Sequence, residues 1–245
     1  MNTSIEDLKK VIRDSNNIVF FGGAGVSTAS GVPDFRSATG LYNRKNDSNF
    51  SPEYMLSHEF FVNHPDEFMK YCKENLMIDG IKPNNAHKAL AYLEKIGKLK
   101  GVITQNIDSL HQEAGSKNVI ELHGNLRDYY CLDCGKSFDL DYVKGFDGVV
   151  KCDHCGGIVR PDIVLYGESL NQDNLSYAVS LISQADVLII GGTSLVVYPA
   201  AGLIDFYNGN KLVLINKDTT PRDAKADYLI QGDISKVMKE LVEDL

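Results

Sequence analysis

The sequence predicts an α/β protein whose main domain is a parallel β-sheet with helices on both faces, accompanied by a smaller second domain. Three observations lead to this fold class. Short, predominantly apolar runs occur at residues 18–21, 101–104, 186–190 and 211–215. Helical patterns lie between these runs, and two stretches of different composition interrupt the alternation. Continuous apolar runs are typical of strands that a parallel sheet buries on both faces.

The elements of the main domain follow from local patterns. A first helix is expected after the capping-box pattern of residues 3–7, because Leu8, Val11 and Ile12 follow at helical spacing. The strand at 18–21 ends in Gly22-Gly23-Ala24-Gly25 and is expected to lead through a glycine turn into a helix. Further helices are expected at 86–96 and 175–183.

Two segments are expected to leave the main domain. Residues 37–80 are rich in aromatic residues and show helical fragments, whereas the chain from residue 129 to about 161 is rich in Gly and Asp and carries two cysteine pairs. We therefore predict a small domain made of a helical insertion and a metal-binding module. The predicted boundaries are 41–80 and 126–164 for the small domain, and 1–40, 81–125 and 165–245 for the main one.

Composition excludes several classes of protein. The 245 residues carry 25 Lys and Arg against 33 Asp and Glu, a net charge of −8, which argues against nucleic acid as a partner. The chain has no apolar run long enough to cross a bilayer, and residues 1–10 do not form a signal-peptide pattern. We therefore expect an intracellular, cytoplasmic protein with no membrane partner.

The cysteine pairs have the spacing of a zinc site. Each pair is Cys-x-x-Cys, 17 residues separate the two pairs, and a glycine follows each one. The expected zinc ligands are Cys131, Cys134, Cys152 and Cys155. Four thiolates leave no position for water, so the zinc would be structural. His154 is an alternative ligand on paper, a redox role for the pairs is a second alternative, and Cys72 is interpreted as a small buried hydrophobe.

The glycine turn by itself does not establish a nucleotide site. Residues 23–27 resemble a dinucleotide-binding turn, in which missing side chains let backbone N–H groups approach a pyrophosphate. However, Thr28 stands where the third glycine of the usual fingerprint would be, and no acidic residue clearly ends a second strand about 20 positions later. An unrelated tight turn explains this segment nearly as well.

A set of further motifs resolves this ambiguity. Gly-Val-Pro-Asp-Phe-Arg occupies 31–36, Thr-Gln-Asn-Ile-Asp occupies 104–108, and His123-Gly124 precedes the cysteines. After the cysteines come Arg-Pro-Asp-Ile-Val-Leu-Tyr-Gly-Glu at 160–168 and Gly-Thr-Ser-Leu-Val-Val-Tyr-Pro at 192–199. With these motifs in this order, essentially the whole chain resembles the sirtuins, NAD-dependent protein lysine deacylases, in their compact prokaryotic form. The resemblance implies that the main domain is a Rossmann-like NAD-binding domain.

The resemblance also implies a reaction. The oxygen of acetyl-lysine would attack the ribose C1′ of NAD and expel nicotinamide to give an alkylamidate, and the products would be lysine and O-acetyl-ADP-ribose. His123 matches the family's general base, and Asn106 matches a second catalytic position. His123 follows the strand-like residues 119–122, so it would sit at the carboxyl end of a strand, where open α/β sheets bind ligands. The other five histidines are interpreted as surface or internally satisfied residues.

Further positions are assigned to NAD by the resemblance, several of them to its nicotinamide. The matching residues are Ala24, Ser27, Thr28, Val32, Phe35, Arg36, Gln105, Asn106, Ile107, Asp108, His123, Thr193, Ser194, Asn216 and Ile234. Ordinary structural roles remain open for some of them. Phe35 also suits a core, Arg36 a solvated ion pair with Asp34, Asn216 a turn, and Thr193-Ser194 a helix cap.

The resemblance implies that an acyl-lysine peptide adds as a strand between residues 164–168 and 192–196. The expected peptide contacts are Val164, Tyr166, Gly167, Glu168, Leu195 and Val196. Tyr166 departs from the family, which commonly has Phe there. Sirtuins that prefer succinyl or malonyl groups carry Tyr-x-x-Arg, and this chain contains no such motif. An apolar tunnel without a fixed cation disfavours an acyl carboxylate, so short, neutral acyl groups are expected.

The motifs leave three other functions open. The nearest alternative keeps the NAD site but transfers ADP-ribose to a protein or to water. A zinc-ribbon module that binds NAD as a sensor would not need a base at His123. A hydride-transferring dehydrogenase fits least, because the glycine fingerprint is incomplete.

Overall fold

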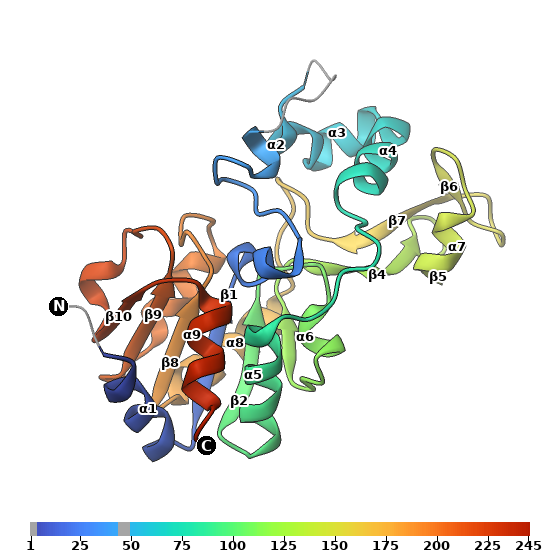
Figure 1. Cartoon of the computed structure of the whole chain (residues 1–245). Coiled ribbons are helices and arrows are strands. Elements are labelled where there is room, and N and C mark those ends of the chain that lie inside the picture. Colours follow the sequence, from blue (N-terminus) through green and yellow to red (C-terminus); the bar gives the residue numbers. More distant parts are fainter. Residues whose placement is uncertain (1–3, 44–49) are drawn as a thin grey trace.

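The computed structural model describes residues 4–43 and 50–245, which form two bodies of unequal size (Figure 1). The larger body contains a six-stranded parallel sheet, and the smaller one contains a four-stranded antiparallel sheet and a group of short helices. The chain crosses between the bodies several times. Each body therefore combines segments that are distant in sequence.

The parallel sheet has the strand order β10-β9-β8-β1-β2-β3. Its strands are β1 (Ile18–Gly22), β2 (Leu99–Thr104), β3 (Val119–Glu121), β8 (Val187–Gly191), β9 (Leu212–Asn216) and β10 (Tyr228–Gln231). Every residue of β1 and of β8 is buried, as expected for central strands covered on both faces. From β1 the chain first adds β2 and β3 on one side of the sheet and later adds β8, β9 and β10 on the other side. The strand order therefore reverses beside the central strand β1.

Helices cover both faces of this sheet. On one face lie α1 (Ile5–Asp14), α5 (Asn85–Lys95) and α9 (Ile234–Val242), whose apolar side chains share a core with Phe20 of β1. On the other face α8 (Gln172–Gln184) and the 3₁₀ segment η4 (Ala200–Phe206) pack with Phe21. Neighbouring residues of one strand thus enter opposite cores. The predicted fold class, a Rossmann-like parallel sheet with helices on both faces, is confirmed.

The smaller body is built from two separate segments. Its sheet has the order β5-β4-β7-β6, with β4 (Gly124–Cys131), β5 (Ser137–Asp139), β6 (Val150–Lys151) and β7 (Ile158–Ile163), and α7 (Leu140–Lys144) lies beside it. The earlier segment supplies α2 (Pro52–Met55), α3 (His58–Asn63) and α4 (Pro65–Asn75). One buried cluster joins both segments, since Phe60 and Phe68 pack with Tyr129 and Val159. The residue boundaries of the two domains stay a prediction.

Some local expectations differ from the structure. The glycine turn after β1 leads into two 3₁₀ turns, η1 (Ala24–Val26) and η2 (Thr28–Ser30), and not into an α-helix. Gly31 has a φ of 89° and Pro33 follows, so the segment ends before a helix can develop. The sequence also did not predict β10 or the strands of the antiparallel sheet. The remaining short elements are α6 (Leu110–Glu113), η3 (Leu41–Asn43) and η5 (Asp223–Lys225).

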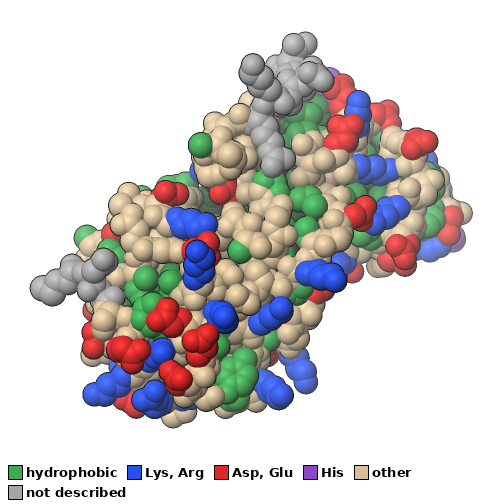
Figure 2. Space-filling view, viewed as in Figure 1, with side chains coloured by type: hydrophobic (Ala, Val, Ile, Leu, Met, Phe, Trp, Pro, Cys, Tyr) green, Lys and Arg blue, Asp and Glu red, His purple; other side chains and the backbone are tan. Residues whose placement is uncertain are grey.

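The surface carries charges of both signs. On the face in Figure 2, Lys and Arg side chains are interspersed with Asp and Glu side chains over both bodies. Within residues 4–43 and 50–245, no helix is long and apolar enough to cross a membrane.

Candidate functional site

A cavity of about 580 Å³ lies where several strands of the parallel sheet end, and both bodies contribute to its wall. Its floor is formed where the turns after β1 and β8 meet. The backbone N–H of Gly25 donates to the carbonyl of Gly192 over 2.8 Å. A Cβ atom on Gly25 would lie 2.8 Å from the Cα of Gly192, so this contact between two backbones requires glycine.

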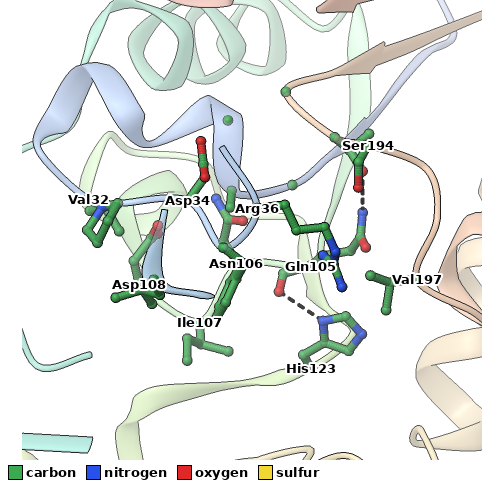
Figure 3. Close-up of a pocket in the computed structure, with 18 of the residues that line it drawn as sticks. Val32, Asp34, Arg36, Gln105, Asn106, Ile107, Asp108, His123, Ser194 and Val197 are labelled. Atoms are coloured by element: carbon green, nitrogen blue, oxygen red, sulfur yellow. Dashed lines mark hydrogen bonds between the residues drawn. The ribbon is translucent and has the colours of Figure 1, made fainter. Parts of the chain in front are cut away.

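His123 projects into the cavity from the end of β3, and its ring orientation is fixed from one side (Figure 3). Its Nδ1 lies 3.0 Å from the carbonyl oxygen of Gln105. A carbonyl only accepts hydrogen bonds, so Nδ1 carries the proton and Nε2 keeps its lone pair. Burial lowers the pKa of His123, and the Gln105 carbonyl partly offsets this effect. The imidazole is therefore neutral at pH 7, as a general base must be.

The segment after β2 supplies a second polar group, held in place by buried partners. Asn106 donates through Nδ2 to Ser27 Oγ over 3.1 Å, and Ser27 donates to Asp108 Oδ2 over 2.6 Å. Burial raises the pKa of Asp108, while the hydrogen bonds from Ser27 and from the Leu110 backbone lower it. These bonds fix the orientations of the Asn106 amide and the Asp108 carboxyl at the cavity wall.

His87 lies behind this network. Its Nδ1 accepts from the backbone N–H of Asn84, so its Nε2 carries the proton and faces Ser27 Oγ at 3.4 Å. Burial lowers the pKa of His87 to about 4, which keeps the ring neutral. His87 is internally hydrogen-bonded, as expected from the sequence, and it is also a direct neighbour of the site. The Asn84-x-x-His87 capping pattern was the available sequence signal.

The cavity extends along the edge of the sheet toward β9. Gln105 donates through Nε2 to Thr193 Oγ1 over 3.0 Å, which joins the ends of β2 and β8. Farther along, Asn216 and Ile234 line the cavity, and the ion pair of Lys217 with Asp233, 2.9 Å long, lies beside them.

The smaller body supplies the opposite wall. The backbone N–H of Val164 donates to the carbonyl of His123 over 2.9 Å, so the segment after β7 runs directly past the histidine. The bend at the end of this segment is held by Arg160, which donates to both carboxylate oxygens of Glu168 over 2.6 and 3.1 Å. Only 4% of the Arg160 side chain is exposed, against 21% for Glu168. No sequence pattern predicted this buried pair.

The structure brings most of the predicted site residues together. Those that line the cavity are Ala24, Thr28, Val32, Phe35, Arg36, Gln105, Asn106, Ile107, Asp108, His123, Val164, Tyr166, Gly167, Glu168, Thr193, Ser194, Asn216 and Ile234. Three others lie outside the wall: Ser27 is fully buried behind it, Leu195 is buried, and Val196 is 47% exposed. Arg36 lies over the ring of Tyr42 at 5.3 Å, and Asp34 accepts from the backbone of Ser37.

Comparison with known proteins identifies the family of this site. The model of the Sir2 family matches residues 23–199, more than half of the chain. The chain belongs to the Sir2 family. A curated relative from Clostridium tetani, named an NAD-dependent protein deacetylase, is 59% identical over 241 residues and covers 98% of each chain. A relative of the same name from Staphylococcus aureus is 48% identical over 245 residues and covers both chains completely.

Solved structures of Sir2 proteins share the fold of this chain. A Sir2 complex with a p53 peptide and NAD⁺ superposes with a TM-score of 0.87 at 41% identity, covering 99% of this chain and 98% of that one. A Sir2 complex with the inhibitor EX-527, 2′-O-acetyl-ADP-ribose and a deacetylated p53 peptide gives a TM-score of 0.86 at 40% identity, with 98% of each chain covered.

The smaller body of this Sir2 family member also contains the predicted cysteine cluster. The four sulfur atoms lie within 4.8 Å of one another, with 3.4 Å between Cys131 and Cys155 and 3.7 Å between Cys134 and Cys152. Tetrahedral zinc with bonds of about 2.3 Å to sulfur requires sulfur atoms about 3.8 Å apart. The cluster therefore fits one zinc ion, and His154 is not among the potential ligands gathered there in the described part of the chain.

Proposed function

We propose that this Sir2 family member is an NAD-dependent protein lysine deacetylase that converts acetyl-lysine and NAD to lysine, nicotinamide and O-acetyl-ADP-ribose. The observation that carries the proposal is the orientation of His123. Its Nδ1–H is bound to the Gln105 carbonyl, and its unprotonated Nε2 belongs to a neutral ring in a cavity that both bodies line. A binding protein has no need for such a base.

NAD is consumed in this reaction, and different residues of the cavity are proposed to contact its pyrophosphate, its nicotinamide and its ribose. The turn that contains Gly25 lies at the floor of the cavity and has no Cβ atom at that position. A pyrophosphate can therefore approach its backbone N–H groups closely. Asn106 and Asp108, fixed by Ser27, present an amide and a carboxyl that match the hydrogen-bonding groups of the nicotinamide carboxamide. His123 Nε2 takes a proton from a ribose hydroxyl, so that this oxygen can attack the carbon of the acetyl group.

Phe35 is proposed to exclude water from the reacting carbon. It lines the cavity and packs against the apolar cluster of the smaller body. Removing water protects a reactive intermediate from hydrolysis.

The acyl-lysine peptide is proposed to bind between residues 164–168 and 192–196, with main-chain contacts that leave its sequence loosely specified. Leu76, Ile78 and Leu126 line the cavity on the side of the smaller body. Within the described residues, Arg36 and Lys217 are the cations of the cavity wall, and neither belongs to this apolar side. An acetyl group suits such a wall better than an acyl carboxylate does, because an unpaired buried charge is costly.

Further parts of the proposal concern zinc, domains and location. The four cysteines would hold one structural zinc ion and thereby stabilise the smaller body. The domain boundaries predicted from the sequence are retained. A cytoplasmic location is proposed because the five cysteines form no disulfide in the structure and the zinc site needs its four cysteines reduced.

The proposal is tested by mass spectrometry of an acetyl-lysine peptide incubated with the purified protein, with and without NAD. We expect an NAD-dependent loss of the acetyl group and formation of O-acetyl-ADP-ribose, both abolished in His123→Ala. His64→Ala is the matched control, because His64 lies outside the cavity wall and pairs with Glu67 instead.

Other outcomes would point elsewhere. Release of nicotinamide with ADP-ribose on protein or in solution, and with the acetyl group retained, would identify an ADP-ribosyl transferase or a glycohydrolase. A zinc-loaded protein that binds NAD without consuming it would be a sensor. Faster turnover of a succinyl-lysine peptide than of the acetyl peptide would contradict the proposed acyl preference.

A further inference from the structure

Two tyrosines join opposite walls of the cavity. Tyr42 comes from η3 at the end of the loop that carries Phe35, and Tyr166 comes from the segment after β7. Their hydroxyl oxygens lie 2.6 Å apart, a strong hydrogen bond between residues 124 positions apart in sequence. We call this contact the tyrosine clasp.

On one side, the clasp holds the loop that carries Phe35. The backbone N–H of Tyr42 donates to the carbonyl of Phe35 over 2.9 Å, and the rings of the two residues lie 5.4 Å apart. The N–H of Leu41 donates in the same way to the carbonyl of Asp34 over 2.8 Å. Tyr42 and Phe35 are therefore held next to each other through both their backbones and their rings.

On the other side, the clasp is attached to a fixed point. The N–H of Tyr166 donates to the carbonyl of Leu56 over 3.0 Å, and its own carbonyl accepts from the N–H of His58 over 2.9 Å. The buried pair of Arg160 and Glu168 secures the bend that follows. Both backbone groups of Tyr166 are thus hydrogen-bonded, which holds its side chain in place at the cavity wall.

We propose that the tyrosine clasp positions Phe35 over the cavity and thereby keeps the release of nicotinamide coupled to deacetylation. This inference rests on the proposed function. Tyr42 and Tyr166 are positioning residues, because they act through Phe35. Burial and the hydrogen bond to Tyr166 both raise the pKa of Tyr42, so the Tyr42 hydroxyl stays protonated throughout the neutral range.

The consequence of losing the clasp follows from the chemistry at C1′. After nicotinamide leaves, C1′ is bonded to the oxygen of the acetyl group. If Phe35 moves away, a water oxygen can bond to C1′ while the bond from C1′ to the acetyl oxygen breaks, and the water proton is released to solvent. NAD and water then give nicotinamide, ADP-ribose and a proton, and acetyl-lysine is regenerated unchanged. The loss of coupling therefore appears as nicotinamide in excess over freed lysine.

The test measures nicotinamide and freed lysine peptide in the same reaction, after subtraction of nicotinamide released without peptide. The variants are Tyr42→Phe, Tyr166→Phe and the double variant, all of which keep both rings. Tyr177→Phe is the matched control, since Tyr177 bonds Asn118 and lies outside the cavity wall. Each single variant is expected to increase the excess nicotinamide per lysine about two- to tenfold, the shift in a two-state equilibrium caused by losing one hydrogen bond.

The double variant distinguishes the loss of one shared hydrogen bond from two independent effects of the two hydroxyls. If the hydrogen bond is what matters, the double variant behaves like either single variant, because the bond is already lost in each. Multiplied effects in the double variant, or a wild-type ratio in both single variants, would overturn the inference. Failure of the wild-type protein to free any lysine would instead overturn the proposed function.

Discussion

The ion pair of Arg160 and Glu168 should contribute strongly to stability, and its removal gives the most direct energetic test of the structure. Arg160 makes four hydrogen bonds: two to the Glu168 carboxylate, one to the Ile163 carbonyl over 2.7 Å and one to the Pro161 carbonyl over 3.3 Å. Glu168→Gln would remove the negative charge and place an amide N–H against the guanidinium. The buried Arg160 would then keep its charge without a counterion.

The size of the effect follows from burial. Breaking a fully buried ion pair costs about 3–5 kcal/mol. Since 21% of the Glu168 side chain is exposed, we expect about 2–4 kcal/mol for this pair. For a chain of this length that is a fall in Tm of about 4–16 °C. The protein contains no tryptophan, so thermal unfolding is best followed by circular dichroism.

The chain contains a matched control for this experiment. Arg222 and Asp205 form a similar two-pronged pair, with both distances at 2.8 Å, but 44% of the Asp205 side chain is exposed. Asp205→Asn should therefore cost only about 0–1 kcal/mol. Equal losses in Glu168→Gln and Asp205→Asn would refute the argument from burial. Arg160→Met combined with Glu168→Gln should recover part of the loss, because no buried charge is left unpaired.

The same pair predicts a dependence on pH. Burial raises the pKa of Glu168, but the hydrogen bonds from Arg160 and the Leu165 backbone outweigh it, and the net pKa falls below the ordinary 4.5. A carboxyl whose pKa is lowered in the folded state stabilises the protein above its unfolded pKa and loses that contribution as pH falls through the folded value. The Tm difference between wild type and Glu168→Gln should be fully present at pH 7 and shrink below about pH 4.5. A difference that stays constant as the solution is acidified contradicts this assignment.

Three further predictions concern zinc, proton transfer and the glycine turn. Elemental analysis should find one zinc per chain. A chelator that removes the zinc should make the smaller body sensitive to protease while the parallel sheet stays resistant. Resistance of both bodies after zinc removal would contradict a structural role. Burial lowers the pKa of His123 from its ordinary 6.5, so its base form persists to lower pH. We therefore expect kcat/KM to be flat between about pH 7 and 8 and to fall only below about pH 6.5. A fall in kcat/KM that begins at higher pH would argue against His123 as the base. Gly25→Ala places a Cβ atom 2.8 Å from the Gly192 backbone, and calorimetry should show NAD binding weakened at least about tenfold, because the two backbone segments at the floor of the cavity would have to shift apart. Gly202→Ala, where the nearest atom would be 3.6 Å away, should bind NAD normally.

The sequence predicted the elements whose burial is continuous. Strands β1 and β8 are buried along their whole length, so each left an unbroken apolar run. Strand β10 lies at the edge of the sheet, where only Ile230 is buried, and it left no comparable run. The strands of the antiparallel sheet mix buried and exposed positions over a few residues, as the BBe pattern within β4 illustrates. Short, half-exposed strands do not differ enough from loops to be found in this way.

The predictable part of the site is the part that lies in local motifs. The cysteine spacing and the motif around Asn106 each lie within a short stretch of sequence. The contacts between Tyr42 and Tyr166 and between Ser27 and His87 join residues 124 and 60 positions apart. Such pairs depend on how the two bodies and the sheet are assembled, and no pattern in the sequence specifies them.

The arrangement of the sheet explains why these distant segments meet at one place. From β1 the strand order proceeds through β2 and β3 on one side and through β8, β9 and β10 on the other. The segments that follow β1 and β8 touch at Gly25 and Gly192 and then continue to opposite faces of the sheet, and an open α/β sheet has its binding crevice at such a point. The hydrogen bond from Gly25 to Gly192 lies at the base of that crevice. The second segment of the smaller body, which contains β4 to β7, is inserted between β3 and β8. The chain that returns from it passes His123 and forms the other wall, so His123 lies in the crevice between the two bodies.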